Sequence, residues 1–78
     1  MTPTITVYTR QGCKLCAQAE RVVAEVAAGR ARVELVDIDA DPAITERYTV
    51  RVPVVAIDGV ELFEFHVEAS QLREALEG

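Results

Sequence analysis

Two cysteines three positions apart, Cys13 and Cys16, are the residues of this sequence best suited to chemistry. A pair at this spacing can alternate between a dithiol and a disulfide, or can give two thiolate ligands to a metal. As a disulfide, the pair closes too short a loop to stabilise the fold much through loop entropy. Small secreted domains that are stapled by disulfides typically carry roughly four or more cysteines. The pair therefore indicates reactivity rather than structural stapling.

The position of the pair in the chain favours redox chemistry. Residues 4–9 are β-branched and aromatic, as in a strand, and apolar residues then recur at helical spacing between positions 15 and 26. Cys13 therefore falls at the start of an expected helix. Free backbone N–H groups and the positive end of the helix dipole stabilise an anion there, and the reactive form of a cysteine is the thiolate anion.

The helix geometry predicts different roles for the two cysteines. We expect Cys13 to be the exposed nucleophile, and Cys16, one turn further along the same face, to be the more deeply placed resolving cysteine. Residues at this spacing lie about 5–6 Å apart, which suits a disulfide. Lys14 and Arg10 bring positive charge to this region, which could lower the pKa of the Cys13 thiol further, and both are candidate substrate-binding residues.

The remaining segments predict an α/β fold with the element order β-α-β-α-β-β-α in a single domain, residues 1–78. Asp41 and Pro42 are typical of a helix start, Gly29 of a helix end, and Asp58-Gly59 of a two-residue hairpin turn. The first β-α-β unit should be a parallel crossover and the last two strands an antiparallel hairpin, with helices on both faces of the sheet. Strands are expected at residues 4–9, 33–38, 52–57 and 60–65, and helices begin near Cys13, Pro42 and Ala69.

Composition excludes several classes of partner. The net charge is −5 and the eight basic residues are scattered, whereas nucleic acids and anionic membranes need a clustered basic surface. No stretch approaches the ~20 apolar residues of a membrane span, and the N-terminal residues do not resemble a targeting segment. We expect a cytoplasmic, monomeric protein that binds neither nucleic acid nor membrane.

Three segments resemble a known family. The runs 7–16 (VYTRQGCKLC), 36–39 (VDID) and 51–54 (RVPV) are similar to the glutaredoxin-like proteins of the thioredoxin fold. Nearly the whole chain follows the family's order. The likeness is strongest to short bacterial glutaredoxin-like proteins with a Gly-Cys-x-Leu-Cys site.

The resemblance implies features that composition and spacing do not. It implies a minimal thioredoxin fold whose four-stranded mixed sheet has the order 2-1-3-4. It implies that Pro53 follows a cis peptide bond and packs beside the dithiol, although only about 5–6% of X–Pro bonds are cis in general. It further implies that the backbone of Val52 pairs with the bound substrate.

The sequence departs from true glutaredoxins at two places that bear on the reductant. Lys14-Leu15 stands between the cysteines where those proteins usually have Pro-Tyr. The segment 64–68 (EFHVE) stands where they carry a Gly-Gly-x-Asp turn that holds the amino end of glutathione. Glutathione or another low-molecular-weight thiol therefore stays possible as electron donor without being implied, and no cofactor is expected.

Three other side chains have both a functional and an ordinary interpretation. Arg51, and also Arg10, could bind a substrate carboxylate, but Arg51 is more typical of a solvated residue at the sheet edge. Tyr8 could border the substrate groove or pack beneath a helix. His66, at an expected strand–helix junction, is more typical of a cap or a solvated residue than of a ligand.

The leading functional hypothesis is a thiol–disulfide oxidoreductase. It would reduce disulfides of proteins or small molecules, and a reductase or a small thiol would restore its dithiol. Two alternatives stay open: a module that binds zinc or an iron–sulfur cluster through the two thiolates, and a redox-inert interaction domain. Zinc is disfavoured because the chain has one histidine and no further cysteine, although a cluster could be shared by two chains.

Overall fold

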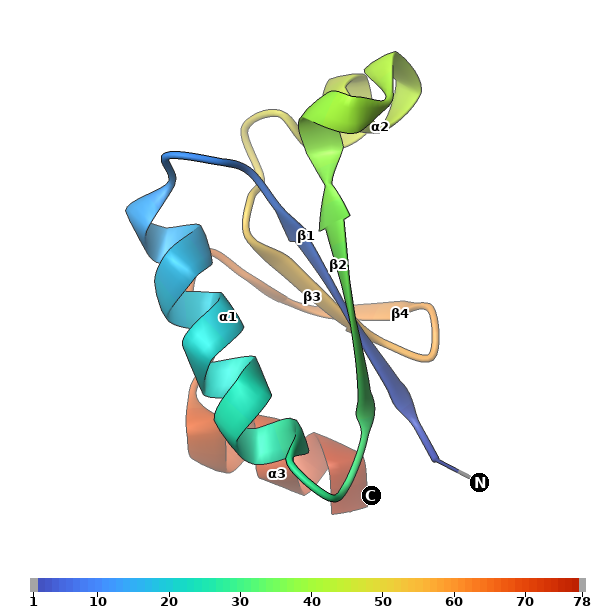
Figure 1. The fold of residues 1–78 in the computed structure, drawn as a ribbon. Helices are drawn as coiled ribbons and strands as arrows, with labels where there is room; N and C mark the ends of the chain where they lie inside the picture. Colours follow the sequence, from blue (N-terminus) through green and yellow to red (C-terminus); the bar gives the residue numbers. More distant parts are fainter. Residues whose placement is uncertain (1, 78) are drawn as a thin grey trace.

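The order of secondary structure follows the expected β-α-β-α-β-β-α pattern, with one additional turn of 3₁₀ helix, in a computed structural model that describes residues 2–77 (Figure 1). The elements are β1 (Thr4–Thr9), α1 (Lys14–Ala27), β2 (Arg32–Asp37), η1 (Ile38–Ala40), α2 (Pro42–Tyr48), β3 (Val54–Ile57), β4 (Val60–Glu64) and α3 (Ala69–Glu77).

Three of the strands differ in their boundaries from the expected ones. The second strand lies one residue earlier than expected, because the Asp37 carboxylate accepts a hydrogen bond from the Asp39 N–H and turns the chain into η1. The third strand begins at Val54 and not at Val52, after Pro53, which has no N–H to give to a ladder. The fourth strand ends at Glu64, since Phe65 has a φ of 66° and leaves the extended conformation.

The sheet has the order β2-β1-β3-β4. β1 pairs with β2 in parallel and with β3 in antiparallel, and β3 pairs with β4 in antiparallel. The hairpin between β3 and β4 turns at Asp58 and Gly59, whose φ values of 50° and 86° are the positive pair that a two-residue turn of this kind needs. The parallel first unit and the antiparallel last pair are therefore confirmed.

One face of the sheet carries the main core. Ile5 and Val7 on β1 and Val55 on β3 point toward α1 and α3, which lie together on this face, and all three side chains are buried. Val23 of α1 and Leu72 of α3 complete the contact from the helices. The alternation of buried and half-buried residues along β1 follows from the two-residue period of a strand.

α2 covers the other face of the sheet only near the end where β1 and β2 finish (Figure 1). Its Tyr48 packs with Ile38 of η1 and Val54 of β3 in a second buried cluster. None of the helices in residues 2–77 has the length and apolar character that crossing a membrane requires.

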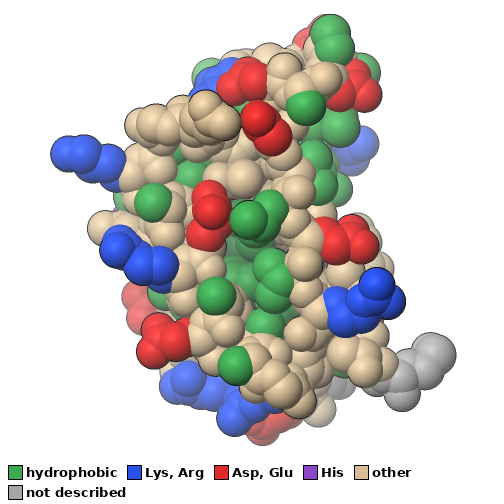
Figure 2. Space-filling model, viewed as in Figure 1, with side chains coloured by type: hydrophobic (Ala, Val, Ile, Leu, Met, Phe, Trp, Pro, Cys, Tyr) green, Lys and Arg blue, Asp and Glu red, His purple; other side chains and the backbone are tan. Residues whose placement is uncertain are grey.

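Hydrophobic side chains also gather in a hollow between α1 and β2, at the centre of the view in Figure 2. Val33 and Leu35 of the edge strand β2 contribute to it and are 40% and 56% exposed. The main core thus extends to the surface along this edge.

Candidate active site

The turn between β1 and α1 places the first cysteine at the start of a helix. Gly12 has a φ of 77°, a conformation that glycine adopts without steric cost, and this lets the chain reverse before the helix. Cys13 is the N-cap of α1, and its Sγ accepts a hydrogen bond from the Cys16 N–H at 3.1 Å. A sulfur at this position faces the free N–H groups and the positive end of the helix dipole.

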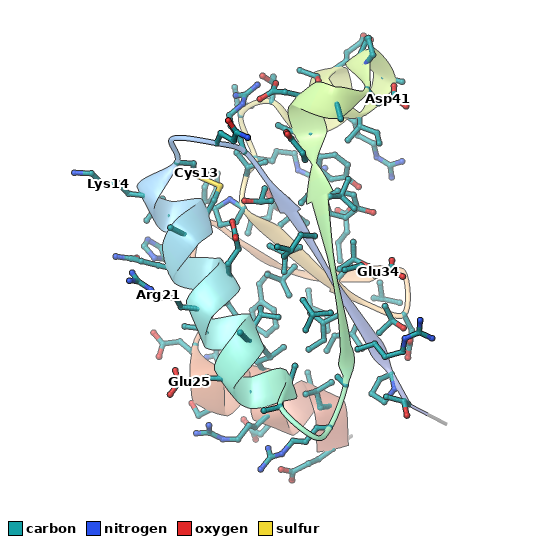
Figure 3. The ribbon with its side chains drawn as sticks, viewed as in Figure 1. Cys13, Lys14, Arg21, Glu25, Glu34 and Asp41 are labelled. Carbon is teal, nitrogen blue, oxygen red and sulfur yellow. A yellow bond between two sulfur atoms is a disulfide. The ribbon has the colours of Figure 1, made fainter. Side chains whose placement is uncertain are left out.

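The two cysteines form a disulfide and differ in accessibility. Their Cα atoms lie 5.2 Å apart, as expected for residues three apart on a helix. Cys13 is partly exposed, whereas Cys16 is fully buried against the sheet. An incoming sulfur can therefore reach Cys13, which Figure 3 labels at the start of α1, more easily than Cys16.

The peptide bond between Val52 and Pro53 is cis, as the family resemblance implies. Antiparallel pairing of Tyr8 with Val54 brings Pro53 beside the end of β1, from which the chain continues into the cysteine turn. Pro53 is fully buried, and its carbonyl accepts a hydrogen bond of 2.8 Å from the Phe65 N–H.

Arg51 is bound by two carboxylates of β4. Its Nη2 lies 2.6 Å from Glu61 Oε1 and its Nε lies 3.2 Å from Glu64 Oε2. Its guanidinium also lies over the Tyr48 ring, 5.2 Å from the centroid. The guanidinium is thus held against the protein and is not simply solvated at the sheet edge.

The two tyrosines of the chain stack on each other in this region. The ring centroids of Tyr8 and Tyr48 lie 4.2 Å apart with an angle of 17° between the planes. The Tyr48 hydroxyl donates to Glu61 Oε2 at 2.6 Å. Burial, and then this hydrogen bond, raise the pKa of Tyr48, while the same bond and the Arg51 guanidinium lower the pKa of Glu61.

Arg10 joins the cysteine turn to the region before β3. Its Nε and Nη2 donate to the two carboxylate oxygens of Asp39 at 2.9 and 2.8 Å, and its Nη1 donates to the Thr49 carbonyl at 3.1 Å. This hydrogen-bonded pair lowers the pKa of Asp39. The charge of Arg10 is therefore largely compensated by Asp39 and is not free to act on Cys13 alone.

Lys14 is the basic residue nearest to the disulfide in sequence. Its side chain extends into solvent, away from the sulfur atoms (Figure 3). Within residues 2–77 it forms no ion pair. It remains available to an anionic group on a partner.

Several residues that shape this region were missed by the sequence analysis. Tyr48 was not singled out, and Glu61, Glu64 and Asp39 were not identified as partners of Arg51 and Arg10. The available signal was the two acidic residues of the last strand, Glu61 and Glu64. Their contact with Arg51 cannot be predicted until the tertiary arrangement is known. Within residues 2–77, no group of three or more histidine, cysteine, aspartate or glutamate side chains is placed to hold a metal ion.

Comparison with known proteins supports the fold and identifies the family. A family model described as Glutaredoxin-like domain (DUF836) matches residues 4–77. The chain is 36% identical to XcR50 from X. campestris over 94% of this chain and 95% of that one, with a TM-score of 0.79. It is 23% identical to Ne2328 from Nitrosomonas europaea, with 96% and 92% covered and a TM-score of 0.78. None of the curated proteins matches the sequence significantly.

A thioredoxin is among the similar structures. A mutant thioredoxin from Halobacterium salinarum is 26% identical, with 96% of this chain and 72% of that chain covered and a TM-score of 0.72. The mixed sheet in the order β2-β1-β3-β4 with its three helices is a thioredoxin-like fold, as the sequence predicts. The fold and the Cys13–Cys16 pair together support a role of the thiol oxidoreductase kind.

Proposed function

Because the chain belongs to the glutaredoxin-like domain family, we propose that it reduces disulfides, with Cys13 as the nucleophile and Cys16 as the resolving cysteine. The observation that carries this proposal is the position of Cys13. Its sulfur caps α1 and accepts from the Cys16 N–H, while Cys16 itself is fully buried. A helix N-terminus stabilises a thiolate, and the thiolate is the attacking species.

The reaction runs in two exchange steps. The Cys13 thiolate attacks one sulfur of the substrate disulfide, a mixed disulfide forms, and the other substrate sulfur leaves as a thiolate that takes up a proton. Cys16 then loses its proton and attacks the Cys13 sulfur, which forms the Cys13–Cys16 disulfide and releases the second substrate thiol. Two electrons pass from the dithiol to the substrate, and an external thiol or a reductase must return them.

The segment before β3 is the proposed contact for the substrate backbone. Val52 is half-buried and directly precedes Pro53, which lies beside the end of β1. We assign substrate pairing to the main chain of Val52, and to Lys14 a contact with an anionic group of the partner. We assign a positioning role to Arg51, Arg10 and Tyr8, whose contacts are within the protein: they hold the cysteine turn and the segment before β3.

The two cysteine variants test this proposal. Reduced Cys16→Ser protein, mixed with a disulfide substrate, should accumulate a mixed disulfide through Cys13 because the resolving thiol is missing. Reduced Cys13→Ser protein should form little adduct, since its only thiol is buried. Mass spectrometry of the quenched mixtures gives both results. Trapping by Cys13→Ser but not by Cys16→Ser would reverse the roles, and trapping by neither would refute the proposal.

A further inference from the structure

The backbone around Phe65 adopts a conformation that is rare for a large side chain. The Phe65 N–H donates to the Pro53 carbonyl at 2.8 Å, and the His66 N–H donates to the Glu64 carbonyl at 2.7 Å. The second bond closes a three-residue γ-turn around Phe65, whose φ is 66°. The γ-turn with a positive central φ is rare and strained, and glycine would take this conformation at less cost.

Core packing does not account for a phenylalanine at this position either. Its side chain is 43% exposed and does not belong to either buried cluster. It lines a hollow of about 410 Å³ between α1 and the segment that joins β4 to α3. Leu15 and Val22 of α1 and Val67 of the joining segment add further apolar surface to this hollow.

The hollow adjoins the segments that carry the proposed active site, although neither cysteine lines it. Leu15 lies between the two cysteines, and Phe65 is hydrogen-bonded to Pro53, so both walls are attached to the segments that surround Cys13. A substrate whose sulfur reaches Cys13 while its backbone pairs with Val52 can reach this opening with a neighbouring residue.

The chemistry of the hollow indicates what kind of group it accepts. Its polar lining consists of one guanidinium, two carboxylates, an amide and an imidazole, so it offers no concentrated charge to an ionic ligand; these groups belong to Arg21, Glu25, Glu68, Gln18 and His66. Figure 3 shows Arg21 and Glu25 projecting from α1 toward solvent. Half of the lining residues are apolar and can make the contact, and a volume of this size accommodates a large aliphatic or aromatic side chain.

We propose that this hollow binds an apolar side chain adjacent to the cystine of a protein substrate, and that Phe65 determines this specificity. The inference rests on the proposed disulfide reduction and names its substrate class: exposed protein disulfides flanked by an apolar residue. The γ-turn at Phe65 holds an aromatic ring partly exposed in the same hollow as Leu15, which lies between the two cysteines in sequence. Strained backbone of this kind is often found at functional sites.

The test compares two disulfide-linked peptides that differ only in the residue next to cysteine, leucine in one and serine in the other. Reduced protein is mixed with each peptide under single-turnover conditions, quenched in acid, and the second-order rate constants are measured. The protein should react with the leucine peptide about tenfold faster than with the serine peptide, the discrimination that an apolar pocket commonly gives.

The variants Phe65→Gly and Phe65→Asn remove the ring, and both residues accept a positive φ. In each, the preference for the leucine peptide should fall below about twofold. Leu62→Asn is the matched control, because Leu62 lies on β4 and is 46% exposed, close to the exposure of Phe65. It should retain the full preference. Circular dichroism establishes that all three variants are folded.

The outcomes separate the inference from the proposed function. Equal rates for the two peptides in the unmodified protein, or a preference that persists in both Phe65 variants, would overturn the specificity assignment. Reduction of hydroxyethyl disulfide without reduction of either peptide would also overturn it. If the reduced protein reacts with none of the three disulfides, the proposed function itself fails.

Discussion

Glu61 is expected to be the most important residue of the network that holds the segment before Pro53, and replacing it by alanine should lower stability. Its carboxylate accepts from the Tyr48 hydroxyl at 2.6 Å and pairs with Arg51 at 2.6 Å. Tyr48 is only 4% exposed, so the substitution leaves a nearly buried hydroxyl without its acceptor. An unpaired buried polar group costs about 1–3 kcal/mol.

The cost can be converted into a melting temperature. For a domain of this size, 1 kcal/mol changes Tm by about 4–8 °C, so a loss of about 2 kcal/mol lowers Tm by roughly 8–16 °C. The ion pair with Arg51 adds little to this figure because solvent screens it. Thermal unfolding followed by circular dichroism measures the change.

Glu64→Ala is the matched control for Glu61→Ala. Glu64 lies on the same strand and also pairs with Arg51, at 3.2 Å, but the Tyr48 hydroxyl donates to Glu61. Its replacement should change stability by no more than about 0.5 kcal/mol, as for most surface substitutions. A double-mutant cycle with Tyr48→Phe should give a coupling of about 1 kcal/mol between Tyr48 and Glu61. Equal effects of the two alanine variants, or no coupling, would refute this account of the network.

Three further predictions concern acid stability, thiol reactivity and the electron donor. The pKa values of Asp39 and Glu61 are lowered in the folded protein, so the unfolded chain takes up protons first as the pH falls. The free energy of unfolding should therefore be at its full value above about pH 4.5 and decline below it. Urea unfolding from pH 6 to pH 3 measures this, and a Glu61→Gln profile as steep as that of the unmodified protein would contradict it. In the reduced protein, iodoacetamide should modify Cys13 well before Cys16, because Cys16 is fully buried; peptide mapping would disprove this by finding equal labelling. Turnover with glutathione and its reductase should be poor compared with turnover with thioredoxin reductase, because Phe65, His66 and Val67 stand where a glycine turn would hold the tripeptide. The loss of two charge-assisted hydrogen bonds weakens glutathione binding about a hundredfold or more. Saturation of the rate at low millimolar glutathione would contradict the prediction.

The sequence by itself determined the local features of the site. Gly12 separates a β-branched run from a helical pattern and so placed Cys13 at a helix start. A short window of sequence is enough for this, because apolar residues repeat every two positions in a strand and every three to four in a helix. Asp41-Pro42 and Asp58-Gly59 marked a helix start and a hairpin for the same reason: capping and turn chemistry depend on immediate neighbours. The strand order and the cis bond before Pro53 followed from the family resemblance and not from these local rules.

Only the tertiary structure decided how distant residues share the site. Arg10 and Asp39 are 29 positions apart, and Tyr48 and Glu61 are 13 apart. Such contacts depend on how strands align and on which face each side chain takes, and a shift of one residue in register reverses the face. The ends of the second and fourth strands were predicted one residue too late. The Asp37 carboxylate accepts from the Asp39 N–H and ends the second strand, and the hydrogen bond from the Phe65 N–H to the Pro53 carbonyl accompanies the turn that ends the fourth. The positive φ of Phe65 could not be foreseen, since a bulky residue disfavours it unless the surrounding structure imposes it.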